Sequence, residues 1–329
     1  MNITTERLWL QKGWQLFQGY LKQNRVPHAL LITGQKGIGK SELAKQFTYS
    51  LLCNQPQNNS LHCGQCQSCL LLTANTHPDF CLIQPEEDKQ SISINQIRAV
   101  VSDTYLKPQF DTYRVVIINP ADNLTISAAN AFLKCLEEPG ERTIFLLLTS
   151  KPDKLPATIV SRCQKITVVF PERPLIYKYM KEQGIQNNQE TLLRLAQGSI
   201  LSIQEINDQE VLNQRKECFQ DWLAVVARKS QPSIIAEKWQ KIPEAILINW
   251  LLSWVSDLIK NSFITKPEYL TNQDLVKYLQ ELSQQLDLKE LFTLYDKLLL
   301  NRKLLASQLN FQIVLEEILV QWQQLNRSY

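Results

Sequence analysis

A loop of eight residues, Gly34 to Ser41, constrains the fold of this chain more than any other part of its sequence. Its letters, GQKGIGKS, match the pattern G-x-x-x-x-G-K-[ST], which wraps phosphate when a buried strand precedes it and a helix begins within it. The apolar run His28–Thr33 comes directly before the loop, and a helical pattern over 40–52 follows it. Glycine is scarce, nine residues where average usage gives roughly 23, yet three lie between Gly34 and Gly39. The loop therefore predicts an α/β nucleotide-binding fold.

Phosphate binding explains why each of these residue types occurs in the loop. Gly34, Gly37 and Gly39 let backbone N–H groups curl around phosphate oxygens. Lys40 is placed to reach the β- and γ-phosphates, and Ser41 to coordinate Mg²⁺. The pattern predicts that ATP or ADP can bind here, and it leaves open which of the two is present.

Hydrolysis needs a further acid, at the end of a second strand, to hold Mg²⁺. The run Arg114–Asn119 is the candidate strand, and Asn119 and Pro120 stand where two carboxylates are expected. A neutral amide is a weaker ligand for Mg²⁺, and proline has no group that could activate water. Asp122 lies further on and is interpreted as capping or local structure before the next helix. We therefore expect a nucleotide loop without hydrolysis.

Two further apolar runs, 143–149 and 165–170, follow the second strand, and a helical pattern over 127–138 separates it from them. Strands that alternate with helices predict a parallel sheet covered on both faces. After Pro171 the pattern becomes helical, with a break at Gly198. No convincing strand follows 208, where the helical candidates are 209–229, 243–264, 273–286, 288–306 and 309–326.

The length of 329 residues predicts more than one domain. We expect a P-loop domain over 1–170 with a cysteine-rich insertion at 53–69. A small helical lid over 171–207 and an all-α domain over 208–329 are expected to follow.

Four of the eight cysteines lie within 17 residues, at Cys53, Cys63, Cys66 and Cys69. A C-x-x-C step lets two thiolates reach one ion, and tetrahedral Zn²⁺ takes four such ligands. Nothing in the loop offers an acid, a base or an open coordination position, so we predict a structural zinc site. Unligated cysteines and an iron–sulfur cluster are the less favoured alternatives.

Charge and hydropathy exclude other classes of protein. Lys+Arg 35 against Asp+Glu 32 leaves +3, too balanced for a dedicated nucleic-acid or membrane-binding protein. The N-terminus has no signal-peptide pattern, and the most apolar stretch, Ile246–Val255, is too short to span a bilayer. We expect a cytoplasmic protein, in a reducing compartment that favours metal over disulfides.

Three further strings carry a resemblance to a known family. They are NAFLKCLEEP at Asn130–Pro139, FLLLTSKPDKLP at Phe145–Pro156, and Ser161-Arg162-Cys163. In this order, after a P-loop and a four-cysteine insertion, they resemble the AAA+ subunits of bacterial DNA polymerase III clamp loaders. The delta-prime subunits are the most similar. The resemblance is strong over 25–170 and weaker beyond, where the helices match the family's collar domain by position and length.

The resemblance implies roles for particular residues. Arg162 corresponds to an arginine finger, which stabilises transition-state charge on ATP held by a neighbouring subunit. Thr149 and Ser150 fall at the sensor-1 position, near the γ-phosphate. Leu201 stands where active members carry a lid arginine, so a second ATPase part is missing. The implied protein is a non-hydrolysing stator.

The implied partners are a motor subunit of tau/gamma type and a clamp-opening subunit of delta type. Through the complex they also include the sliding clamp and primed DNA. Two alternatives stay open. The intact loop Gly34–Ser41 would also suit an autonomous ATPase of tau/gamma type. A zinc-dependent DNA-binding protein would need basic residues in its loop, and 54–69 has no Lys or Arg.

Overall fold

The structure is a computed structural model. It describes residues 7–57, 60–87, 89–104, 107–110, 112–186, 189–196, 198–263, 267–304 and 310–325. The chain forms two compact units. The first comprises Met1–Glu182 with Gly198–Leu201, and the second comprises Gln183–Gln197 with Ser202–Tyr329. The predicted lid, 171–207, is thus divided between the units, and the boundaries proposed for the three domains stay a prediction.

The first unit is built on a parallel sheet of five strands in the order β2-β3-β4-β1-β5. The strands are β1 (Ala29–Thr33), β2 (Phe80–Ile83), β3 (Arg114–Ile118), β4 (Thr143–Thr149) and β5 (Gln164–Thr167). Every residue of β1, β3 and β4 is buried, as the continuous apolar runs predict for strands covered on both faces. The predicted fold class is confirmed.

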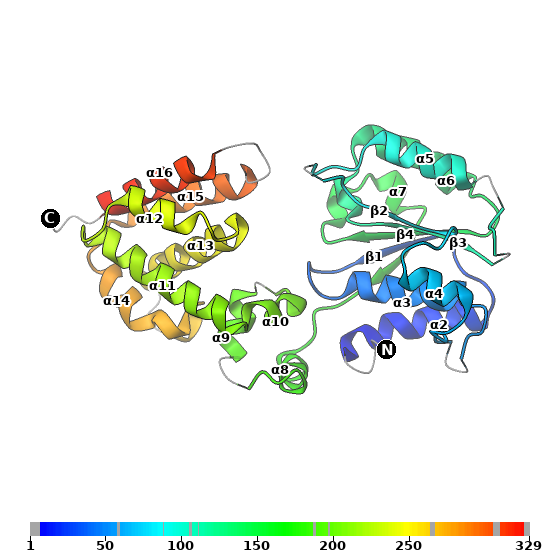
Figure 1. Ribbon diagram of the computed structural model, residues 1–329, viewed down its shortest axis with the longest axis horizontal. Helices are drawn as coiled ribbons and strands as arrows, with labels where there is room; N and C mark the ends of the chain where they lie inside the picture. The colour runs from blue at the N-terminus through cyan, green and yellow to red at the C-terminus, as the bar shows by residue number, and fades with distance from the viewer. Residues whose placement is uncertain are drawn as a thin grey trace. The chain divides into compact units, whose positions relative to one another are not determined.

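Helices cover the sheet on both faces (Figure 1). One layer consists of α2 (Gln11–Lys22), α3 (Lys40–Leu52) and α4 (Gln67–Thr73). The other consists of α5 (Ile94–Thr104), α6 (Ile126–Glu137) and α7 (Ala157–Val160). Alternate strand residues such as Leu31, Val116 and Phe145 share one apolar core with α6 and α7. This core therefore packs α6 and α7 against one face of the sheet.

The remaining helix of the first unit is α8 (Arg173–Glu182), whose Tyr179 meets Trp9 edge to face, with ring centroids 5.1 Å apart. The second unit is helical. Its longer helices are α9 (Gln189–Leu195), α11 (Gln209–Val226), α12 (Pro232–Trp239), α13 (Glu244–Asn261), α14 (Val276–Ser283), α15 (Leu288–Leu304) and α16 (Phe311–Gln324), and α10 (Ile203–Ile206) is a single turn.

One apolar core joins the helices from α11 onward. Trp222 and Trp322 stack at its centre with ring centroids 3.7 Å apart, and the Trp322 indole donates to the carbonyl of Trp222. Arg215, also buried, is neutralised by Asp274 at 2.7 Å. Within the residues that the structure describes, no helix combines the length and apolar character that a membrane crossing requires.

The expected strands and long helices are present, with five additions and one shorter strand. The sequence did not suggest β2, α4, α5, α7 or α12 as separate elements. The last strand, expected over 165–170, comprises Gln164–Thr167, and Val168 directly after it still donates its backbone N–H to the carbonyl of Thr33.

Candidate functional site

The phosphate loop lies at the carboxyl edge of the sheet, where α/β proteins bind ligands. Thr33 ends β1 and Thr149 ends β4, and the two are register partners. The N–H of Gly34 donates to the carbonyl of Thr149 at 3.3 Å. Asn119, which follows β3, is held at the same edge by donating its N–H to Ile83. The residues predicted from three separate strings therefore meet at one place.

Lys40 is the first residue of α3 and is almost fully buried. Its ammonium donates to the carbonyls of Gly34 and Gln35, each at 2.7 Å. Burial lowers the pKa of Lys40, and the charges of Asp122 and Glu42 oppose that shift. A phosphate would have to replace these carbonyl partners to gain the ammonium.

The polar residues at the strand ends bond to one another. The side-chain amide of Asn119 donates to Ser41 Oγ at 3.3 Å. The hydroxyl of Thr149 donates to Asp122 Oδ1 at 2.6 Å and accepts from the N–H of Lys151. The structure thus places Thr149 beside the loop and brings in Asp122, whose contact the sequence did not suggest. Ser150 comes next in the chain and is partly exposed.

The segment Gly198–Leu201 lies against the phosphate loop within the same unit. The N–H of Leu201 donates to the carbonyl of Gly37 at 3.0 Å. Gly37 has a φ of +70°, and a Cβ added there would stand 1.8 Å from Ser199 Oγ. Gly39 also has a left-handed φ, +104°, and precedes the first turn of α3. Glycine is therefore required at position 37 both by conformation and by space.

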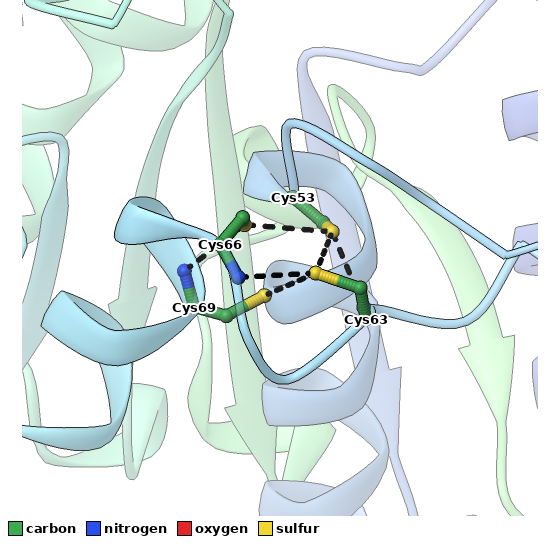
Figure 2. Close-up of side chains that lie close together, drawn as sticks. All are labelled: Cys53, Cys63, Cys66 and Cys69. Carbon is green, nitrogen blue, oxygen red and sulfur yellow. Dashed lines mark hydrogen bonds between the residues drawn. The ribbon is translucent and has the colours of Figure 1, made fainter.

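The four clustered cysteines converge at the end of α3 and the beginning of α4 (Figure 2). Their sulfur atoms all lie within 4.8 Å of one another, so the cluster could hold a metal ion. The Sγ of Cys53 lies 3.6 Å from that of Cys63 and 3.9 Å from that of Cys66. Cys63 and Cys69 are 3.9 Å apart. These are the four residues that the sequence predicted as ligands, and the structure brings their sulfur atoms together.

Backbone N–H groups point at the same sulfur atoms. Gln65 and Cys66 donate to Cys63 Sγ at 3.5 and 3.3 Å, which lowers the pKa of the Cys63 thiol to about 6. Burial raises the pKa of Cys69. The Cys63 thiol thus ionises more readily than the Cys69 thiol. A dication among the four sulfur atoms would favour the thiolate form of all of them.

A hydrogen-bond chain that the sequence did not suggest supports the cluster. The Ser68 hydroxyl donates to the carbonyl of Leu52 at 2.6 Å and lies 2.9 Å from His77 Nε2. His77 Nδ1 accepts from the N–H of Asp79, so its proton is assigned to Nε2. All four residues are buried, and the chain ties α4 to the end of α3. His62, in contrast, packs on Tyr49 and stands apart from the four sulfurs.

Arg162 lies at the opposite edge of the sheet. It stands two residues before β5, which runs parallel to β1, so it is near the amino ends of the strands. Its guanidinium donates to Glu137 Oε1 at 2.8 Å and to the carbonyl of Thr158 at 3.1 Å. Cys163 packs into the core beside it, and burial raises the pKa of this thiol to about 12. Cys163 thus anchors the turn that presents Arg162.

The chain is similar in sequence to subunits of DNA polymerase III. Residues 9–171 match the family described as DNA polymerase III, delta subunit, and residues 209–324 match its C-terminal family. The chain is 32% identical to the DNA polymerase III subunit delta' of Pseudomonas aeruginosa, over 95% of this chain and 96% of that one. Identity to the Yersinia pestis subunit delta' is 29%, over 96% and 94%. A Thermotoga maritima protein related to the gamma subunit aligns with a TM-score of 0.48 at 16% identity, over 95% and 99%.

Replacement of Gly37 by alanine should destabilise the protein. The new Cβ would collide with Ser199 Oγ, and alanine disfavours the left-handed φ that the backbone has there. We therefore expect the free energy of unfolding to fall by about 2 kcal/mol. The measurement is chemical or thermal unfolding of the full chain.

Gly19→Ala is the matched control. Gly19 lies in α2, and an added Cβ would meet nothing within 4 Å, so a gain of about 0.5–1 kcal/mol is expected. An unfolding midpoint for Gly37→Ala at or above that of the wild type would contradict the contact between the loop and Ser199.

Proposed function

Because the chain belongs to the DNA polymerase III delta' family, we propose that it acts in the clamp loader as a stator which does not hydrolyse ATP. In this proposal Arg162 is the working residue, and it acts on ATP bound by a neighbouring motor subunit. The guanidinium would stabilise the charge that develops on the transferring phosphoryl group. This chain itself would carry out no chemistry.

The position of Arg162 in the sheet is the observation that carries this proposal. The phosphate loop follows the carboxyl end of β1, and Arg162 precedes the amino end of β5. The five residues of β1 alone span about 16 Å between those edges. An arginine side chain does not bridge that distance. A finger at this place can therefore serve only a phosphate that another chain holds.

Non-hydrolysis of a nucleotide in this chain's own loop is supported by the residues around Ser41. The Ser41 hydroxyl would be a ligand of Mg²⁺, and its neighbour after β3 is the amide of Asn119, which donates a hydrogen bond to it. A carboxylate there would instead share the metal. Pro120 offers no base, and the lid carries Leu201. Lys40 and the loop glycines remain suited to hold the phosphates of ATP or ADP.

Zinc is proposed as the metal of the cysteine cluster. A tetrahedral Zn²⁺ ion with Zn–S bonds of about 2.3 Å separates its sulfur ligands by about 3.8 Å. The three sulfur pairs described above are 3.6, 3.9 and 3.9 Å apart. The ion would be structural, since four thiolates leave no open position. It would join α3 to α4 where the chain has few apolar side chains.

The helical second unit is proposed to serve as the collar through which clamp-loader subunits associate. The partners would be a motor subunit of tau/gamma type and a clamp-opening subunit of delta type, in the cytoplasm. The assembled complex would place the sliding clamp on primed DNA. Family membership and the length of the alignment to the delta' relatives support this proposal.

Arg162→Ala should lower the ATPase rate of the reconstituted clamp loader. We expect turnover to be lost at the site that faces this chain, because a trans arginine contributes about 10³–10⁵ in rate. Arg162→Lys should not restore it, since an ammonium lacks the planar fork of a guanidinium. DNA-stimulated ATPase measured with the complete complex tests this, and unchanged turnover would exclude the finger.

The purified chain is expected to hydrolyse no ATP above the rate of its Lys40→Ala variant. Steady-state phosphate release by the chain alone, with Mg²⁺ present, is the measurement. A turnover that depends on Lys40 would show instead that the loop supports catalysis, as in an autonomous motor subunit.

The cysteine cluster should hold one Zn²⁺ per chain, and replacement of Cys66 and Cys69 together by serine should release it. Loss of the ion is expected to lower the unfolding temperature, because the four thiolates would no longer join α3 to α4. Native mass spectrometry reports the metal. Cys81→Ser lies outside the cluster and should retain it, whereas a folded, metal-free wild type would disprove the site.

A further inference from the structure

We propose that Glu137 is a positioning residue for Arg162, holding the guanidinium in the orientation from which it acts. This inference rests on the proposed function of Arg162 and extends it to a second residue. Glu137 is the last residue of α6, and Arg162 follows the short helix α7. The two are 25 positions apart in sequence, yet Arg162 Nη2 and Glu137 Oε1 are separated by 2.8 Å.

The elements that carry the pair are fixed by the core. Leu136 and Cys135 of α6 are buried directly before Glu137, and Ile159 of α7 is buried in the same cluster. Cys163, after Arg162, is packed against that cluster. The backbone atoms of both partners are therefore held by apolar packing. Only the two side chains need to be ordered.

Two acceptors define the direction of the guanidinium. Glu137 Oε1 takes a hydrogen bond from Nη2, and the carbonyl of Thr158 takes one from Nη1 at 3.1 Å. A guanidinium has five N–H donors. Within the described part of the chain two of them donate hydrogen bonds, so three are left that could bind a phosphate. If Glu137 had paired with Arg162 through both carboxylate oxygens, it would have used a second N–H donor of the guanidinium. This arrangement orients Arg162 while it leaves the side chain competent to bind an anion.

The location of the carboxylate also suits a cation. Glu137 ends α6, where the carbonyl groups of the last turn give the helix a negative pole. That pole and the Glu137 charge both attract a guanidinium. Arg162 therefore has a defined resting position at the surface, rather than the many rotamers open to an exposed arginine.

The pair is too exposed to matter for folding. The Arg162 side chain is 38% exposed and the Glu137 side chain 52% exposed, so solvent screens their attraction. Orientation of a long side chain is a different quantity from stability. It decides how much of the time the guanidinium points where a partner's phosphate would arrive, and it should therefore affect turnover and leave unfolding unchanged.

The test uses the complete clamp loader and the part of its ATPase rate that Arg162→Ala removes. In Glu137→Ala we expect that part to fall about three- to tenfold, as for loss of one charge-assisted hydrogen bond, with KM for ATP unchanged. Glu137→Gln keeps an acceptor oxygen without the charge and should stay within about twofold of wild type. Adding Glu137→Ala to Arg162→Ala should cause no further loss.

Glu138→Ala is the matched control. It removes an equal charge at the next position, on a residue that is also exposed, and it should leave turnover unchanged. Thermal unfolding and zinc content of each variant should match the wild type. If Glu137→Ala retains the full Arg162-dependent rate, or slows the Arg162→Ala complex further, the positioning role of Glu137 is wrong and the arginine finger is unaffected. If Arg162→Ala itself has no effect, the finger and the positioning role both fall.

Discussion

Parallel pairing of the five strands is the constraint on which the rest of the first unit depends. Because every strand runs in the same direction, the sheet has one edge of carboxyl ends and one of amino ends. The phosphate loop occupies the first edge, and Arg162 the second. A strand length of buried, apolar backbone separates them. The phosphate loop and Arg162 are thus kept apart by the fold.

A small number of specific contacts hold the loops at each edge. At the carboxyl edge the strand ends are tied by Asn119 to Ser41 and by Thr149 to Asp122. Next to α3, sulfur atoms from Cys53 to Cys69 converge where the chain is polar. At the amino edge the partly buried side chain of Cys163 packs against the apolar core, beside Arg162. Each loop is therefore positioned by a few contacts that a single substitution can test.

The sequence predicted those parts of the fold and the site that depend on short patterns. The phosphate loop and the cysteine cluster each lie within one short segment, so spacing alone indicated their chemistry. It missed β2, an edge strand that is only partly buried and whose apolar run, FCLI, is only 4 residues long. It also missed the contacts of Asp122 with Thr149 and of Glu137 with Arg162, which lie 27 and 25 positions apart. Only the folded sheet brings those residues together.

An intact phosphate-loop pattern does not by itself require ATP turnover. Gly37 is already demanded by the close approach of Ser199 and by its left-handed φ, whether or not a phosphate binds. Lys40, once buried at the beginning of α3, is satisfied by two carbonyls of the loop itself. Hydrolysis depends on groups that come from other strands, and there the chain has Asn119 and Pro120. The loop pattern therefore indicates the fold, and whether ATP is hydrolysed depends on the residues at the neighbouring strand ends.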